Sequence, residues 1–221
     1  MNVILFGATG MVGLGVLREC LLDPGVARVL TVGRSATGQK HPKLREVTLP
    51  EMLDYSSIER ELTGFDACFF CLGVSAAGMS EDAYRRVTYD ITLAAARTLV
   101  RLNPAMTFIY VSGASTDSTE RGRAMWARVK GSTENALLRL PFKAAYMFRP
   151  GVIQPLHGIR SKTGWYNTFY TVARPLLPLL RKLAPRYVTT TELVGRAMLR
   201  VVRQGAPSPI VENAEINRLG Q

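Results

Sequence analysis

Residues 1–13 read Met-Asn-Val-Ile-Leu-Phe-Gly-Ala-Thr-Gly-Met-Val-Gly, an apolar stretch that runs into a glycine-rich turn. Val3–Phe6 has the composition of a buried strand, and a helix is expected directly after the turn. Gly7 allows a tight turn off the strand, Gly10 lets the backbone approach a pyrophosphate, and Gly13 lets the helix pack against the sheet. The helix start would present free N–H groups and the positive end of its dipole to phosphates. The pattern therefore predicts a dinucleotide site; the alternative is a turn that needs glycine only for its shape.

Length and composition indicate one folded domain over residues 1–221. The chain is 47% hydrophobic and 20% charged, and no repeat or low-complexity linker divides it. Residues 150–203 break the earlier rhythm and are interpreted as a segment that shapes a substrate pocket. The sequence shows no secretory signal pattern, which leads us to expect a cytoplasmic location. Its apolar runs are too short, or too interrupted by proline and arginine, for the roughly 20 residues of a membrane span.

Cysteine, histidine and net charge narrow the classes of function. The three cysteines, Cys20, Cys68 and Cys71, form no disulfide framework. Cys68 and Cys71 are three residues apart, which on a strand directs them to opposite faces, so we expect core residues rather than metal ligands. With only two histidines, no metal site is predicted. The net charge of +11 favours anionic ligands or surfaces. No nucleic-acid-binding pattern accompanies it.

Strand-like and helix-like segments alternate along most of the chain. This alternation predicts an α/β fold with a doubly wound parallel sheet of the Rossmann type. A capping box, Thr189-Thr190-Thr191-Glu192, is expected to start the last long helix. The predicted strands are Val3–Phe6, Val29–Val32, Val47–Leu49, Ala67–Leu72, Thr107–Val111, Ala144–Phe148 and Ile210–Val211. The predicted helices are Met11–Leu22, Ile58–Leu62, Ala83–Leu102, Arg121–Leu140 and one that runs up to Arg203.

Several motifs together resemble the atypical short-chain dehydrogenase/reductases, in the branch that includes the HIV Tat-interacting protein and epimerase- or dehydratase-like relatives. The resemblance covers residues 3 to 203 in order. It rests on Gly7-Ala-Thr-Gly-Met-Val-Gly13, Val32-Gly33-Arg34, Asp66-Ala-Cys-Phe-Phe-Cys-Leu-Gly73, Phe108-Ile-Tyr-Val-Ser112, Lys130-Gly131 with Glu134, and Phe148-Arg-Pro-Gly-Val152.

This resemblance implies a site for NAD(P). Arg34 stands where an acidic side chain would bind the ribose of NAD, and a guanidinium there suits the 2′-phosphate of NADPH, which is the expected cofactor. Lys130 would bind the nicotinamide ribose. Asp54 is expected either to contact the adenine or to cap a helix. The other implied cofactor residues are Gly7, Thr9, Gly10, Met11, Val12 and Gly13 around the pyrophosphate, Leu72 and Gly73 beside the adenosine ribose, and Pro150, Gly151 and Val152 at the nicotinamide carboxamide.

The catalytic positions depart from the family pattern. The usual Tyr-x-x-x-Lys pair reads Trp126-Ala-Arg-Val-Lys130, and an indole has no acid or base function near neutral pH. The usual serine position falls on Gly113, with Ser112 and Ser115 on either side as candidate catalytic residues together with Lys130.

Three interpretations stay open. The chain is a divergent reductase of an unknown small carbonyl substrate, with Tyr84, Tyr166 or water as the acid. It is instead a catalytically inactive sensor that binds NADPH and a protein partner. In the third interpretation, residues 174–183, which are basic and leucine-rich, contact an anionic membrane from one side.

Overall fold

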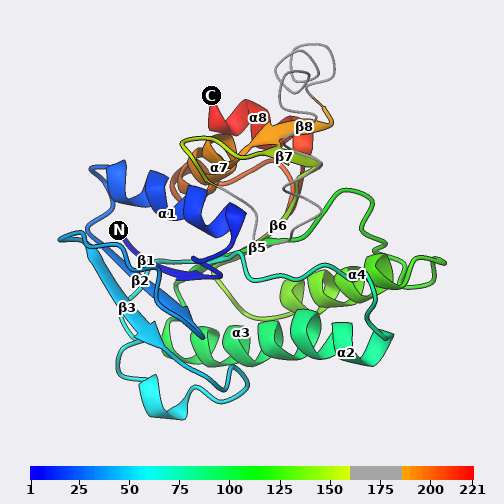
Figure 1. The fold of residues 1–221 in the computed structure, drawn as a ribbon, viewed down its shortest axis with the longest axis horizontal. Helices are drawn as coiled ribbons and strands as arrows, with labels where there is room; N and C mark the ends of the chain where they lie inside the picture. Colours follow the sequence, from blue (N-terminus) through cyan, green and yellow to red (C-terminus); the bar gives the residue numbers. More distant parts are fainter. Residues whose placement is uncertain (160–185) are drawn as a thin grey trace.

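The computed structural model describes residues 1–159 and 186–221 (Figure 1). Tyr166, the basic segment 174–183 and the rest of residues 160–185 of the predicted pocket-shaping segment lie outside the described residues. Within the described ranges, no helix is both long enough and apolar enough to cross a membrane.

The centre of the fold is a seven-stranded sheet in which every pairing is parallel. Its strand order is β3-β2-β1-β4-β5-β6-β9, so the first six strands have the order of a Rossmann fold. The predicted doubly wound parallel sheet is therefore confirmed. The strands are β1 (Asn2–Phe6), β2 (Arg28–Gly33), β3 (Leu44–Thr48), β4 (Ala67–Phe70), β5 (Thr107–Val111), β6 (Ala144–Arg149) and β9 (Ile210–Glu212). A separate parallel pair joins β7 (Val152–Gln154) to β8 (Val188–Thr190).

Helices cover both faces of the sheet (Figure 1). One face carries α1 (Met11–Leu22), α7 (Thr191–Gln204) and α8 (Asn213–Gly220). The other carries α3 (Ile91–Leu102) and α4 (Met125–Leu138), with α2 (Glu81–Arg85) and the short helix η1 (Ser56–Ile58) at its margins. Since helices shield both faces, the central strands β1 and β4 are almost wholly apolar, whereas the edge strand β3, Leu-Arg-Glu-Val-Thr, is more polar and has no fully buried residue.

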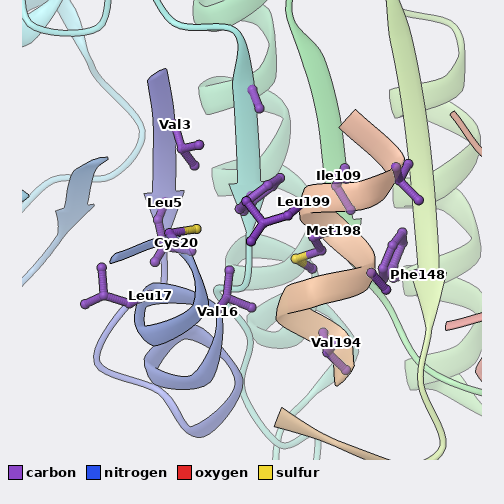
Figure 2. Packing of buried hydrophobic residues seen from close by; sticks show 14 of the residues in the cluster. Val3, Leu5, Val16, Leu17, Cys20, Ile109, Phe148, Val194, Met198 and Leu199 are labelled. Atoms are coloured by element: carbon purple, nitrogen blue, oxygen red, sulfur yellow. The ribbon is translucent and has the colours of Figure 1, made fainter. Parts of the chain in front are cut away.

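Alternate residues of each strand enter two separate cores. In β1, Val3 and Leu5 join the core under α1 and α7, whereas Ile4 and Phe6 join the core under α3 and α4. Figure 2 shows Val16 of α1 and Met198 of α7 packed with the first of these cores. The cysteines follow the same alternation. Cys68 belongs to the second core and Cys71 packs against the first, so the predicted opposite orientation is confirmed.

The helix expected over Ala83–Leu102 is interrupted. A π-helical turn, η2 (Arg86–Asp90), separates α2 from α3, and Ser80 caps α2 by accepting a 3.3 Å hydrogen bond from the amide of Ala83. Such turns add one residue without ending the helix, so hydrophobic periodicity does not reveal them.

Two further predicted helix starts, those of α4 and α7, are wrong, and in place of the helix expected over Ile58–Leu62 the structure has the short helix η1 at Ser56–Ile58. Helix α4 begins at Met125 rather than Arg121, because Asp117 organises a loop before it by accepting bonds from the amides of Thr119 and Gly122 at 3.0 and 2.6 Å. The Thr119 hydroxyl, which donates to Asp117 at 2.6 Å, and the amide of Gly122 lower the pKa of Asp117. Helix α7 is capped by Thr190, whose hydroxyl accepts from the amide of Leu193 at 3.0 Å, so the capping box expected from Thr189 does not form.

Candidate functional site

The turn after β1 lies where the sheet topology changes direction. The chain passes from β1 to β2 on one side, and β4 pairs with the other side of β1. Ligands of open α/β sheets bind at the carboxyl ends of the strands at such a point. The amide of Cys71 donates to the carbonyl of Phe6 at 3.0 Å, which holds the two strand ends together beneath the turn.

Gly7 of the turn and Gly13 of α1 leave no room for a side chain. Gly7 has a φ of 76°, and a Cβ there would stand 2.5 Å from the amide nitrogen of Leu72. A Cβ on Gly13 would lie 2.1 Å from the carbonyl oxygen of Gly7. The backbone of the turn therefore touches both the β4 loop and α1. Any side chain at these positions would push the elements apart.

The start of α1 is open to an anion. Gly10 is the N-cap residue, no side chain caps the helix, and no acidic residue lies in its first turn. Thr9 and Gly10 form the turn, and the Gly10 amide donates to the carbonyl of Gly7 at 2.9 Å. Met11 and Val12 begin the helix, so their amides belong to the unsatisfied donors of a helix start. These predicted residues lie together, and the arrangement fits a pyrophosphate group.

Arg34 follows the last residue of β2 at the same edge of the sheet. Its side chain is exposed, and it forms no hydrogen bond or ion pair in the part of the chain that the structure describes. The guanidinium is thus available to a ligand. Asp54 accepts a 2.9 Å bond from the amide of Ser56 at the start of η1. The N-cap residue of η1 is Tyr55 and no side chain caps this helix, so Asp54 is not its N-cap, and the expected contact with the adenine stays a prediction.

The loop after β4 approaches the glycine turn from the other side. Leu72 follows the strand and its amide nitrogen packs against Gly7. Gly73 is exposed, and a Cβ placed on it would have no neighbour within 4 Å. The structure therefore brings these two predicted residues to the turn and leaves open space beside Gly73.

The predicted carboxamide-binding residues have most of their backbone groups engaged. The carbonyl of Pro150 accepts from the amide of Ala114 at 2.9 Å. The amide of Gly151 donates to Asn213 Oδ1 at 2.9 Å, and that of Val152 donates to the carbonyl of Tyr187 at 2.8 Å. These bonds fix the loop after β6 rather than leave its amides for a ligand.

The two candidate serines differ in their surroundings. Ser112 is buried, and its hydroxyl lies 3.0 Å from that of Thr116, which donates to the carbonyl of Gly113 at 2.8 Å. Ser115 is exposed and has a φ of 66°. A Cβ on Gly113 would meet nothing within 4 Å, so this position has space that a serine could fill. Sequence reasoning missed Thr116, which holds the Ser112 hydroxyl.

Lys130 and Trp126 lie one turn apart on α4. The Nζ of Lys130 stands 5.5 Å from the ring centroid of Tyr110, and the side chain forms no hydrogen bond or ion pair with the described residues. Burial lowers the pKa of Lys130 from 10.5 to about 8, while Glu134 acts in the opposite direction. Tyr84, an alternative proton donor, is only 2% exposed, so its phenol is poorly placed to reach a substrate.

Comparison with known proteins gives the family. No family model matches the sequence. The mitochondrial protein FMP52-1 of Scheffersomyces stipitis is 30% identical over 157 residues, which are 69% of this chain and 67% of that protein. The chain belongs to the Fmp52 family of atypical short-chain dehydrogenase/reductases. Another Fmp52 relative, the mitochondrial protein fmp52 of Emericella nidulans, is 30% identical over 159 residues, 69% of this chain, and the match spans 66% of that relative's length.

Solved structures agree with the fold of this Fmp52 family member. The Bordetella bronchiseptica enzyme WbmF in complex with NAD+ superposes with a TM-score of 0.66 at 16% identity, covering 98% of this chain and 76% of WbmF. A UDP-N-acetylglucosamine 4-epimerase from Methanobrevibacter ruminantium M1 gives 0.70 at 14% identity, covering 99% and 79%.

The expected cytoplasmic location is wrong. The Fmp52 relatives are named as mitochondrial proteins, which contradicts it. The expectation rested on finding no secretory signal, and that observation does not distinguish the cytoplasm from an organelle.

A buried ion pair joins Glu134 of α4 to Arg149 of β6, one helical turn from Lys130. No role was assigned to this pair from the sequence. Glu134 is 0% exposed and receives bonds from Arg149 through Nε at 3.1 Å and Nη2 at 2.5 Å. Although burial alone lowers the pKa of Arg149, Glu134 raises it above its ordinary value. The available signal was a carboxylate three residues before Leu137 on the buried face of α4.

Proposed function

We propose that this protein binds a nicotinamide dinucleotide at the turn after β1 and prefers NADPH. The backbone contact at Gly7 and Gly13, where a Cβ would collide with backbone atoms, is the observation that carries the proposal. It brings an uncapped helix start to the switch point of the sheet. The NAD+ in the WbmF complex supports the cofactor class, and the exposed Arg34, which directly follows β2, supports a 2′-phosphate.

The reaction we propose is slow reduction of a small carbonyl substrate. When bound, NADPH would supply the hydride. Lys130 would bind the hydroxyls of the nicotinamide ribose, and its ammonium charge is lost as the pH rises through about 8. Trp126 donates a hydrogen bond at most, so water would supply the proton to the substrate oxygen in place of the usual phenol. Because general acid–base catalysis contributes about 10²–10⁴-fold, turnover should be weak.

A second candidate is an NADPH-dependent sensor that binds a protein partner without catalysis. Trp126 and the internal engagement of the Ser112 hydroxyl favour it, because neither then serves as an acid. Such a protein should change its partner binding when NADPH is added. Partner binding that is insensitive to NADPH would contradict this candidate.

Replacing Arg34 with alanine should remove the preference for NADPH. Charge-assisted hydrogen bonds contribute about 1.5–3 kcal/mol, so we expect NADPH affinity to fall roughly 10- to 100-fold while NADH affinity stays unchanged. Calorimetric titration of cofactor-free protein with both dinucleotides measures this. Arg97→Ala is the matched control, since Arg97 is an exposed arginine of α3 on another part of the surface. Equal affinity of the unmodified protein for NADPH and NADH would refute the preference, and binding of neither would refute the cofactor site.

Trp126→Tyr should raise the rate of NADPH-dependent carbonyl reduction. The substitution restores a phenol one helical turn before Lys130, and we expect a gain of about tenfold, below the full range for acid catalysis because Gly113 still lacks the serine hydroxyl. NADPH oxidation with a panel of aldehydes and ketones measures it, with Trp126→Phe as the control without a phenol. If both variants bind NADPH and neither reduces any member of the panel, the sensor is the better description.

A further inference from the structure

Lys130 and Glu134 have the spacing of an ion pair but do not form one. Residues four apart on a helix face each other, and lysine and glutamate at that spacing commonly pair. Here, Glu134 gives both carboxylate oxygens to Arg149, at 3.1 and 2.5 Å. Lys130 lies instead over the ring of Tyr110, 5.5 Å from its centroid. Glu134 therefore pairs with Arg149 and not with Lys130.

Arg149 is itself held in place from two further directions. Its Nη2 donates to Ser118 Oγ at 2.6 Å, in the loop before α4. Its Nη1 donates to Glu212 Oε1 at 3.3 Å, at the end of β9. Because three side chains hold the planar guanidinium, its bidentate pair of hydrogen bonds to Glu134 is kept in place. The arginine also directly precedes Pro150, so its position ties α4 to the loop after β6.

We propose that Arg149 is a positioning residue. By binding both carboxylate oxygens of Glu134, it prevents an ion pair between Lys130 and Glu134 and leaves the lysine ammonium available to the bound ligand. This inference rests on the proposed function, in which that ligand is the ribose of the dinucleotide. Without Arg149, a buried carboxylate one turn away would attract the ammonium, because burying an unpaired charge is costly. Lys130 would then turn along α4 toward Glu134.

The pKa of Lys130 shows whether the lysine pairs with Glu134, because the other titratable groups beside it are phenols. Tyr110 lies beneath it on β5, Tyr84 of α2 interacts with Tyr110, and Glu134 follows on α4. Burial raises the pKa of Tyr110, so this phenol stays neutral. Glu134 is thus the carboxylate that acts on Lys130, whose pKa burial lowers to about 8. A direct pair with Glu134 would favour the charged ammonium and return the pKa toward 10.5.

The test is to measure the pKa of Lys130 in the cofactor-free protein. NMR of ¹³C-methylated lysines gives this pKa as the pH is varied, and the variant Lys130→Met assigns the signal. In Arg149→Met we expect the pKa to rise from about 8 toward 10.5. In the double variant Glu134→Gln/Arg149→Met we expect it to stay at or below about 8, because no carboxylate remains to attract the lysine. Arg149→Lys should give an intermediate rise, since one ammonium cannot occupy both oxygens of Glu134, and it provides the readout if Arg149→Met does not fold.

NADPH titration separates this inference from the proposed function. Affinity should fall at least tenfold in Arg149→Met and recover in the double variant. An unchanged Lys130 pKa in Arg149→Met and Arg149→Lys, or the same rise in the double variant, would overturn the role of Arg149. If the unmodified protein binds no NADPH, the proposed function fails, and the lysine titration still decides whether Arg149 withholds Glu134.

Discussion

Gly13→Ala is expected to destabilise the protein and abolish NADPH binding at the same time. The added Cβ would stand 2.1 Å from the carbonyl oxygen of Gly7 and 2.6 Å from its carbonyl carbon, and backbone cannot rotate out of the way as a side chain can. Overpacking of this kind costs about 3 kcal/mol. In a domain of this size, that loss corresponds to a fall in Tm of roughly 6–12 °C. Since α1 must move away from the turn, its first amides no longer converge on a pyrophosphate.

Thermal unfolding and calorimetric titration of Gly13→Ala measure the two effects. Gly33→Ala is the matched control for stability, because a Cβ there would meet its nearest neighbour, the carbonyl oxygen of Ser35, at 3.8 Å. We expect the control to keep the Tm within a few degrees. A Gly13→Ala protein that unfolds like the unmodified chain and still binds NADPH would disprove the close packing at the turn.

Arg149→Met should produce a large loss of stability at neutral pH. It leaves the carboxylate of Glu134, which is 0% exposed, without its two-pronged partner. Breaking a buried ion pair by removing one member costs about 3–5 kcal/mol. The lower end applies when Lys130 moves to pair with Glu134. The second substitution Glu134→Gln should restore most of the stability, because a neutral amide carries no buried charge.

Chemical denaturation of the two single variants and the double variant measures the interaction between Arg149 and Glu134 directly. Arg101→Met is a matched control, because Arg101 pairs with Glu59 on the surface, and exposed pairs contribute about 0–1 kcal/mol. Equal losses in Arg149→Met and in the double variant would show that the lost contacts of Arg149, rather than the bare charge of Glu134, determine the stability.

The first βαβ unit could be predicted closely from local pattern. Helix α1 spans Met11–Leu22 as expected, and β1 and β2 lie within one residue of the predicted strands. These elements combine a clear hydrophobic period with glycine or proline at their ends, so neighbouring residues alone define them. The starts of α4 and α7 were misjudged because hydrogen bonds from backbone amides to the side chains of Asp117 and Thr190 decide them.

In the candidate site too, local sequence predicted some features, and contacts between distant residues decided the others. The glycine turn and Arg34 were found because each follows a strand in the sequence, and parallel strands bring their ends to one edge. The engagement of Ser112 with Thr116, and of the Gly151 amide with Asn213, depends on which residues meet in space. Chain position alone does not provide that information.

By itself, the sequence determined the seven strands of the central sheet, the glycine turn after β1 and the absence of a phenol at Trp126, because these depend on residue type and local spacing. It did not reveal β7, β8 or α8. Only the tertiary structure decided which charges are paired. Glu134 stands four residues from Lys130 and fifteen from Arg149, and local spacing favours the lysine. The parallel pairing of β5 with β6 places Arg149 beside α4, and its two-pronged bond takes both carboxylate oxygens. Burial makes that pairing decisive, since a carboxylate removed from water needs the donor with the best geometry.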